Sequence, residues 1–415
     1  MITDSVSLLS KFKEVRLQSE RICKPLKTED YVVQPIVDVS PPKWHLGHTT
    51  WFFETFILVP FFKDYSLFNP DYGYLFNSYY ETVGARVIRT DRGNITRPGV
   101  QEVLAYRAYV DEHMEMFLNG EVENEVNDLL ELGLQHEQQH QELLIYDIKY
   151  ILGNNPLFPA YQNQIEKTDT AARPLGWLNI EEGTYKIGFD KQGFSFDNEH
   201  GVHQVFLHEY AVADRLTTNG EYLEFMEDGG YSNFKHWLSD AWEWVKTNEI
   251  KAPEHWHFQD GKWYQYNLSG GLQAVNLDAP VTHISFYEAD AFAKWKGLRL
   301  PTEFEWEVAC LQYGRLDHAK GFSDNGLYQP QSAVNDNQFY GEVWEWTASA
   351  YRPYPYYEAP EGAVGEYNGK FMVNQIVLRG GSCATPKDHI RATYRNFFHP
   401  HLRWMFSGLR LAKHL

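Results

Sequence analysis

The stretch "LGLQHEQQHQELLIYD" (residues 132–147) sets His136 and His140 four positions apart in a run typical of a helix. On a helix, residues i and i+4 lie on one face, about one turn apart. We therefore expect both imidazoles to project toward a bundle interior, along a stripe that also carries Leu143 and Asp147. Each could simply hydrogen-bond a buried group, but a transition metal would serve both at once.

Residues 1–160 are predicted to form a helical bundle. Four segments have the apolar repeat of amphipathic helices: residues 5–22, 44–62, 97–118 and 121–152. Pro60 should end the second helix, and Pro98 suits the first turn of the third. Residues 62–97 would then be a long excursion from the bundle.

The pattern changes after the helical region, and residues 174–415 are predicted to form a mixed α+β domain. Short β-like runs occur at 183–189 and 203–213, interrupted by helical segments at 218–228 and 285–297. The fold class expected from the sequence is therefore an α+β multidomain protein with two units.

Composition excludes several classes of protein. The 415 residues carry a net charge of −19, which argues against nucleic acid and anionic membrane as partners. The three cysteines are far apart, so neither a disulfide framework nor a zinc ribbon is expected. The N-terminus has no signal-peptide core, and we expect a cytoplasmic protein.

The histidine pair has two possible settings. "HEQQH" fits the HExxH pattern, in which Glu137 would be the general base of a zinc metalloprotease, but the extended form of that motif is absent. Alternatively, His45 or His48 in "WHLGH" could meet the pair across the bundle. Three neutral imidazoles would leave positions open on a divalent ion that performs chemistry, and spacing alone does not identify the metal.

Several stretches, taken in order, resemble one known family. They are "WHLGHTTWFFETF", "HEQQHQELL", "EEGTYKIG", "GLRLPTEFEWEVA", "GEVWEWTAS", "LRGGS" and "YRNFFHPHLRWMFSGLRLAK". Together they resemble the iron-dependent sulfoxide synthases of ergothioneine biosynthesis. The resemblance implies a DinB-like four-helix bundle (1–160) followed by a formylglycine-generating-enzyme-like, or C-type-lectin-like, domain (174–415).

The resemblance also implies a metal, an activity and small-molecule partners. His48, His136 and His140 would hold Fe(2+), with His45 at the helix start or beside the ligands. The implied reaction uses dioxygen to form a C–S bond between cysteine and hercynine, giving a sulfoxide.

The implied sulfur-donor site draws on one loop and one C-terminal residue. Tyr79 and Tyr80 resemble the phenols that serve as proton donors in the cysteine-using branch. Arg86 and Arg89 match arginines that bind the donor's carboxylate, a task that suits a guanidinium. Phe398 stands where users of γ-glutamylcysteine carry an acidic residue, so free cysteine is the expected donor.

The implied acceptor site would hold hercynine. Gln139 and Asn396 match residues that hydrogen-bond its imidazole and carboxylate, and Phe397, with aromatic neighbours such as Trp404, could cover its trimethylammonium group. Formylglycine-generating enzymes use a catalytic cysteine pair, which has no expected counterpart here because Cys310 and Cys383 are predicted to be buried small residues.

Other functions remain open from the sequence. The same scaffold could support 5-histidylcysteine sulfoxide synthesis on unmethylated histidine, or selenoneine synthesis through a carbon–selenium bond. A non-catalytic lectin-like protein and the zinc metalloprotease are further alternatives.

Overall fold

The structure is a computed structural model that describes residues 5–78, 80, 83–163, 171–334, 337–361, 365 and 368–415. Contacts divide the chain into two compact units, one of Met1–Tyr161 with Glu361–Tyr367 and one of Gln162–Pro360 with Asn368–Leu415. Among the described helices, none is long and apolar enough to cross a membrane.

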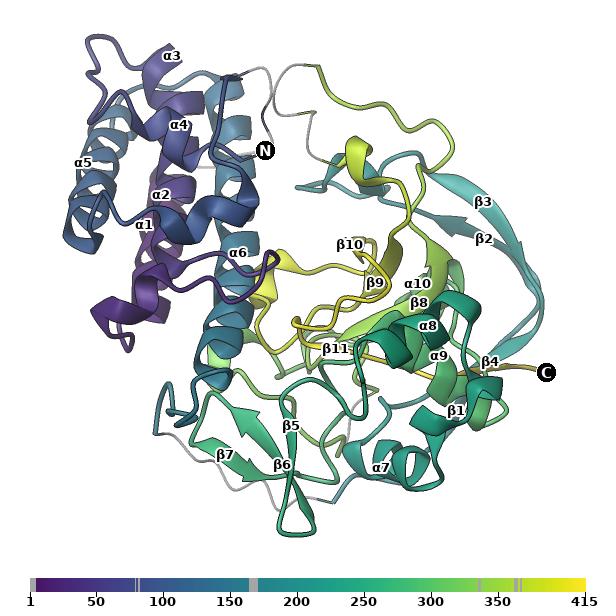
Figure 1. The fold of residues 1–415 in the computed structure, drawn as a ribbon. Helices are drawn as coiled ribbons and strands as arrows, with labels where there is room; N and C mark the ends of the chain where they lie inside the picture. The colour runs from purple at the N-terminus through teal and green to yellow at the C-terminus, as the bar shows by residue number, and fades with distance from the viewer. Residues whose placement is uncertain are drawn as a thin grey trace. The chain divides into compact units, whose positions relative to one another are not determined.

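The first unit is helical, as the sequence predicts. Its α-helices are α1 (Ser5–Cys23), α2 (Pro42–Phe53), α3 (Val59–Phe61), α4 (Tyr72–Phe76), α5 (Val100–Leu118) and α6 (Asn124–Gly153). Four of them, α1, α2, α5 and α6, are long and lie alongside one another in Figure 1. The predicted excursion between α3 and α5 holds α4 and a 3-10 helix, Arg89–Asn94.

Two predicted helix boundaries are wrong. Pro60 does not end the second helix, which continues from α2 through a π-helical turn, Glu54–Leu58, into α3. In that turn Val59 N–H donates to the Glu54 carbonyl five residues back, a local rearrangement that lets the helix pass a residue without an N–H. Pro98 precedes α5 rather than opening it, because Gly99 is the N-cap residue.

Helices α2 and α6 approach each other closely. Gly133 on α6 has no side chain, and a Cβ there would lie 2.6 Å from the ring of Phe53 and 2.9 Å from that of Phe52. Such a separation is shorter than a van der Waals contact, so only glycine lets the helices pack at this distance. The close approach brings the next turn of α6 against α2.

The second unit is a mixed α+β domain. Its helices are α7 (Asn219–Glu227), α8 (Ser239–Thr247), α9 (Phe286–Trp295) and α10 (Glu303–Tyr313). Its strands are β1 (Trp177–Ile180), β2 (Gly183–Ile187), β3 (His203–Leu207), β4 (Tyr210–Ala213), β5 (Trp256–Gln259), β6 (Lys262–Asn267), β7 (Gly271–Ala274), β8 (Trp344–Ala350), β9 (Ile376–Arg379), β10 (Asn396–Phe398), β11 (Ser407–Gly408) and β12 (Ala412–His414).

The described strands form several small sheets. Their orders are β1-β4-β12, β10-β9-β8-β11, β2-β3 and β5-β6-β7. The pairings are antiparallel except between β8 and β11. Strand β12 pairs with β4, so the C-terminal residues complete a sheet begun near residue 177.

Local sequence signals explain where three helices of this unit begin. Thr218, Ser285 and Thr302 are the N-cap residues of α7, α9 and α10, and each is followed three positions later by a glutamate that closes a capping box. The two segments predicted to be helical, 218–228 and 285–297, begin with this signal. Helix α8 lacks a side-chain cap and was not predicted.

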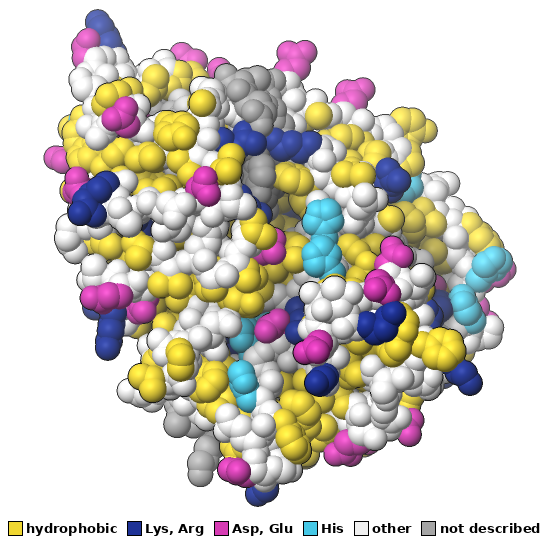
Figure 2. All heavy atoms as spheres, in the orientation of Figure 1, with side chains coloured by type: hydrophobic (Ala, Val, Ile, Leu, Met, Phe, Trp, Pro, Cys, Tyr) yellow, Lys and Arg dark blue, Asp and Glu magenta, His cyan; other side chains and the backbone are white. Residues whose placement is uncertain are grey.

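Acidic side chains are dispersed over the face of the molecule that Figure 2 shows. Figure 2 shows aspartate and glutamate side chains scattered over the visible face, interspersed with lysine and arginine.

Candidate metal centre

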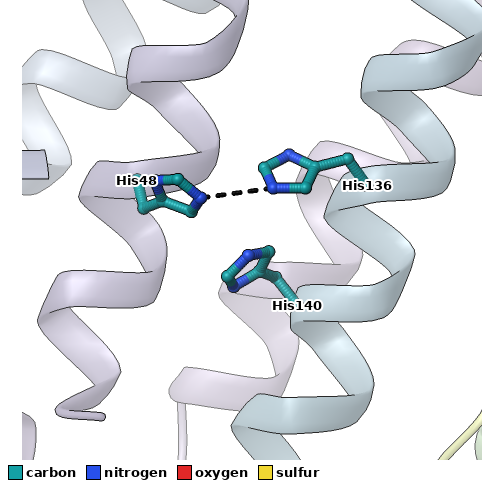
Figure 3. Close-up of side chains that lie close together, drawn as sticks. All are labelled: His48, His136 and His140. Carbon is teal, nitrogen blue, oxygen red and sulfur yellow. Dashed lines mark hydrogen bonds between the residues drawn. The ribbon is translucent and has the colours of Figure 1, made fainter. Parts of the chain in front are cut away.

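Three histidines from two helices meet inside the first unit. One ring nitrogen each from His48, His136 and His140 lie within 4.8 Å of one another. Figure 3 shows His48 on α2 pointing across to His136 and His140 on α6. The structure therefore brings together the three residues predicted as metal ligands.

The orientation of His48 is fixed by a backbone carbonyl. Nδ1 of His48 lies 2.6 Å from the carbonyl oxygen of Phe76, which can only accept, so Nδ1 carries the proton and Nε2 of the neutral ring has a free lone pair. Gly47 allows this contact, because a Cβ at that position would collide with the Phe76 ring. Nε2 of His48 lies 3.2 Å from Nε2 of His136.

A chain of hydrogen bonds fixes the orientation of His140. Nδ1 of His140 lies 2.8 Å from Nδ1 of His45, and Nε2 of His45 lies 2.9 Å from Oδ2 of Asp147. The Ser40 backbone N–H donates to the same carboxylate oxygen at 2.8 Å. His45 is thus held between a carboxylate and one member of the triad.

The surroundings keep the triad neutral. Burial lowers the pKa of His136 to about 4. Burial and the nearby imidazoles hold the pKa values of His48 and His140 well below their ordinary range. Neutral imidazole is the form that coordinates a metal.

The donor set fits a transition metal ion. Metal–nitrogen bonds of about 2.0–2.1 Å place neighbouring ligand nitrogens roughly 3.0–3.4 Å apart, which matches the separation between His48 and His136. Nδ1 of His136 is buried and has no hydrogen-bond partner among the described residues. Three nitrogen ligands leave further positions open, as catalytic sites require.

Glu137 is not available as a base at this centre. Its carboxylate is fully buried and accepts hydrogen bonds from Arg16 at 2.8 Å, Ser19 at 2.6 Å and Arg107. Burial alone would raise the pKa of Glu137, but Arg107 and Arg16 outweigh it and hold the pKa at about 2. The zinc-protease alternative thereby loses its general base.

Two tryptophan rings stack on the His48 imidazole. Trp44 stacks on one ring face with centroids 4.6 Å apart, and Trp51 makes a second stacked contact at 5.6 Å. The guanidinium of Arg92 lies 3.4 Å from the Trp44 ring centroid. Trp44, Trp51 and Arg92 were not among the predicted site residues, although both tryptophans lie in the quoted motif around His48.

The predicted tyrosines can be described in part. Tyr79 lies outside the described residues. Tyr80 is buried, and its ring lies 5.6 Å from that of Trp51 and 5.2 Å from that of Phe56. Since Trp51 stacks on His48, the ring of Tyr80 is one aromatic side chain removed from the triad.

The predicted substrate contacts of the first unit lie on α6, on the 3-10 segment Arg89–Asn94 and, for Arg86, in the irregular stretch just before that segment. Arg86 and Arg89 are half-buried, and Nη2 of Arg89 donates to the Asp38 carbonyl at 2.6 Å. Gln139 is half-buried on α6, one turn after His136 and next to His140.

The remaining predicted substrate contacts form strand β10 of the second unit. Oδ1 of Asn396 accepts from the Phe397 N–H at 2.9 Å. The ring of Phe397 stacks on that of Tyr351 with centroids 4.1 Å apart, while Trp404 packs edge-on against Phe398 at 5.1 Å. Successive side chains of a strand face opposite sides, so neighbours in sequence have different partners.

Cys310 and Cys383 are both buried, in keeping with their predicted role as small packing residues. Burial raises the pKa of the Cys310 thiol to about 12. A thiol that stays protonated at neutral pH is a poor nucleophile, so Cys310 is not set up for redox chemistry.

Comparisons with known proteins match both units. Residues 11–144 match the DinB superfamily, and residues 162–415 match the family described as Sulfatase-modifying factor enzyme 1-like domain. The predicted fold class, a DinB-like bundle followed by a formylglycine-generating-enzyme-like domain, is confirmed.

Three relatives share one name, hercynine oxygenase. The protein from Mycolicibacterium smegmatis is 28% identical over 435 residues, covering 96% of this chain and 97% of that protein. The protein from Mycobacterium tuberculosis is 30% identical over 311 residues (67% of this chain, 70% of the relative). The protein from Mycolicibacterium thermoresistibile is 30% identical over 319 residues, covering 67% of each chain.

Proposed function

The chain belongs to the family of sulfoxide synthases that its motifs resemble, the family of the hercynine oxygenases, and we propose that it joins cysteine to hercynine in an Fe(II)- and O2-dependent reaction. The observation that carries the proposal is the neutral triad of His48, His136 and His140, set across α2 and α6 in a chain with these relatives. The predicted cytoplasmic location stays a prediction.

The reaction balances without a further co-reactant. The thiol S–H of cysteine and one imidazole C–H of hercynine are lost, and a C–S bond forms. One oxygen atom of O2 becomes the sulfoxide oxygen, and the other leaves as water with both hydrogens. The four electrons that reduce O2 come from the two substrates.

Bound Fe(II) supplies Lewis acidity toward a thiolate and the redox capacity to use O2. The protein's own contribution is to keep all three imidazoles neutral. A neutral ligand set leaves the positive charge of the ion uncompensated, which favours the thiolate form of the donor. Arg16 and Arg107 pair with the Glu137 carboxylate, so these guanidinium groups balance its negative charge.

Substrate recognition is proposed for the residues identified by resemblance. Arg86 and Arg89 would bind the donor's carboxylate, and Gln139 with Asn396 would bind hercynine. Phe397 would contribute an aromatic face to the trimethylammonium group. Phe398, apolar where γ-glutamylcysteine users have an acid, leaves no partner for a γ-glutamyl ammonium.

Tyr80, or Tyr79, is proposed to deliver a proton to the reduced oxygen and so to favour sulfoxide over cysteine sulfinic acid. Tyr80→Phe should keep iron and substrate binding nearly intact while the ratio of sulfinic acid to sulfoxide rises. The ratio is read by mass spectrometry of the products. If Tyr80→Phe, Tyr79→Phe and the double variant all keep the wild-type ratio, the phenols have no such role.

The proposed function is tested by anaerobic loading with Fe(II), addition of hercynine and cysteine, and exposure to O2. Mass spectrometry should find a product with the mass of the two substrates, less two hydrogens, plus one oxygen. The product should be absent when the iron is chelated and in the His140→Ala variant.

Parallel reactions separate the sibling activities. In each parallel reaction one substrate is exchanged. Unmethylated histidine replaces hercynine, or γ-glutamylcysteine or a selenium donor replaces cysteine. If one of these exchanged substrates gives a product and the pair of hercynine and cysteine gives none, the proposed reaction is replaced by the sibling reaction that uses that substrate. No oxidised product from any pair would reject the sulfoxide-synthase proposal for this chain.

A further inference from the structure

His45 lies beside the metal centre without belonging to the triad. Its side chain is buried between α2 and α6, with Nδ1 facing His140 and Nε2 facing Asp147. His45 precedes His48 by three residues, and Asp147 follows His140 by seven. These spacings put each outer residue on about the same helix face as its ligand.

The hydrogen-bond chain admits one consistent arrangement of protons around a neutral His45. Oδ2 of Asp147 accepts from the Ser40 N–H and is also the acceptor toward His45, so Nε2 of His45 carries the proton. Nδ1 of His45 then has a lone pair and must accept from Nδ1–H of His140. Consequently Nε2 of His140 has its lone pair free.

The alternative arrangement would disable the ligand. If Nδ1 of His45 carried a proton, Nδ1 of His140 would have to accept it, and the proton of His140 would sit on Nε2. That nitrogen could then not bind an ion. The same contact therefore decides whether His140 is a ligand.

We propose that Asp147 and His45 form a positioning relay that holds His140 in its metal-binding tautomer. The relay also makes His140 a stronger donor, because an imidazole whose other N–H is accepted gains electron density. A stronger donor favours the more highly charged state of an iron ion, so the relay lowers the Fe(III)/Fe(II) potential. The inference rests on the proposed function in one respect, that the triad holds iron.

The two triad helices thus orient their ligands differently. His48 donates to the carbonyl of Phe76, a contact that no side-chain substitution removes directly. His140 depends on two replaceable side chains. Variants at His45 and Asp147 can therefore test the orientation of one ligand while the ligand itself is kept.

The experiment uses the full chain and Fe(II) alone, with no substrate. Affinity is measured anaerobically by competition with a chromogenic chelator, and the Fe(III)/Fe(II) potential by spectroelectrochemical titration. His45→Phe keeps a ring of similar size but cannot accept, and should weaken Fe(II) binding by about 10- to 100-fold. The Fe(III)/Fe(II) potential of the His45→Phe variant should move to more positive values.

Two further variants distinguish the loss of a hydrogen-bond acceptor for His140 from a change in side-chain packing. The amide oxygen of His45→Asn can still accept from His140, so its affinity should stay within about threefold of the wild type. Asp147→Ala leaves His45 free to take either tautomer and should give an intermediate loss. His113→Phe, which alters a histidine of α5 bonded to the Tyr109 carbonyl, is the matched control and should change neither readout.

The outcomes are distinct. Wild-type affinity and potential in both His45→Phe and Asp147→Ala would overturn the relay while leaving the iron site intact. Equal losses of Fe(II) affinity in His45→Phe and His45→Asn would mean that packing of the side chain matters and its acceptance of a hydrogen bond does not. That result would also overturn the relay. A wild-type protein that binds no Fe(II) would reject the iron site and the relay together.

Discussion

The triad of the helical unit and an arginine–glutamate network of the C-terminal unit are both clusters of polar side chains, buried except for the half-buried His140. In the network, Arg379 donates to Glu303 and Glu307, and Arg395 donates to both oxygens of Glu303. The remaining oxygen of Glu307 accepts from the Gly188 N–H at 2.8 Å. All four carboxylate oxygens therefore have a donor within the protein.

The histidine triad does not pair opposite charges in this way. His48, His136 and His140 are held in the neutral form and converge on one point without an opposite charge between them. A cluster that satisfies its own charges supports the fold, whereas one that gathers neutral imidazole nitrogens at a point is prepared for an ion. The difference predicts that the two clusters respond oppositely to mutation.

The largest effect is expected for loss of a ligand. Replacing His48, His136 or His140 by Ala should weaken Fe(II) binding at least ~1000-fold, beyond the ~10–100-fold typical of residues next to the ligands. Unfolding of the metal-free protein should change by less than about 2 kcal/mol, because a neutral hydrogen bond contributes about 1 kcal/mol. Chelator competition and urea unfolding give the two quantities. Full iron occupancy in any variant would remove that residue from the site.

Breaking the closed network should have the reverse outcome. Arg379→Met leaves two buried carboxylates short of a partner and should lower the free energy of unfolding by about 3–5 kcal/mol. Its Fe(II) affinity should be that of the wild type. Lys294→Met removes an exposed pair with Asp290 and, as the control, should cost less than about 0.5 kcal/mol. Equal stability of Arg379→Met and Lys294→Met would contradict the structural role.

Acidification should destabilise the metal-free protein through the triad. Burial lowers the pKa of His136 to about 4 in the folded protein, against about 6.5 in the unfolded chain. Between these values the unfolded chain binds more protons, so the free energy of unfolding falls as the pH drops from about 6.5 to about 4. The slope is up to about 1.4 kcal/mol per pH unit for His136 alone.

His48 and His140, whose pKa values are also lowered, should steepen that loss. Urea unfolding of the metal-free protein at pH 7, 6 and 5 measures this loss of the free energy of unfolding. The His136→Ala variant is the control and should show a smaller slope. Stability that is constant from pH 7 to pH 5 would show that the triad is not held neutral by the fold.

The smallest effect is expected in the choice of sulfur donor. With Phe398 in place, cysteine should be used ten- to several-hundredfold more efficiently than γ-glutamylcysteine, since one charge-assisted contact contributes about 1.5–3 kcal/mol. Phe398→Asp should narrow that ratio, measured as kcat/KM for each thiol. Comparable efficiencies in the wild type would reject this interpretation of Phe398.

Helical periodicity made part of the metal centre predictable from the sequence. The spacing of His136 and His140 indicated one face of α6, but the residues alone left His45 and His48 open as the third ligand, and the family resemblance selected His48. Asp147 lay on the predicted stripe, but its bond to His45 depends on the crossing of two helices, which periodicity does not encode. The carbonyl of Phe76 was beyond prediction for the same reason.

The C-terminal contacts were harder to predict because their partners come from distant strands and loops. The neighbours of Phe397 are Tyr351 and Phe371, while Phe398 packs on Trp404. A strand of three residues carries too little pattern to assign which side each ring faces. Capping boxes, by contrast, are local signals, and α7 and α9, which begin with them, lie in segments predicted to be helical.

Crystals of the Fe(II)-loaded protein, grown without oxygen and measured at the iron absorption edge, test the central claim most directly. The account predicts one anomalous peak within bonding distance, about 2.0–2.3 Å, of one nitrogen each from His48, His136 and His140, with Nε2 of His140 as its donor. A peak bonded to Glu137, to Nδ1 of His140 or at another site in the chain would contradict it.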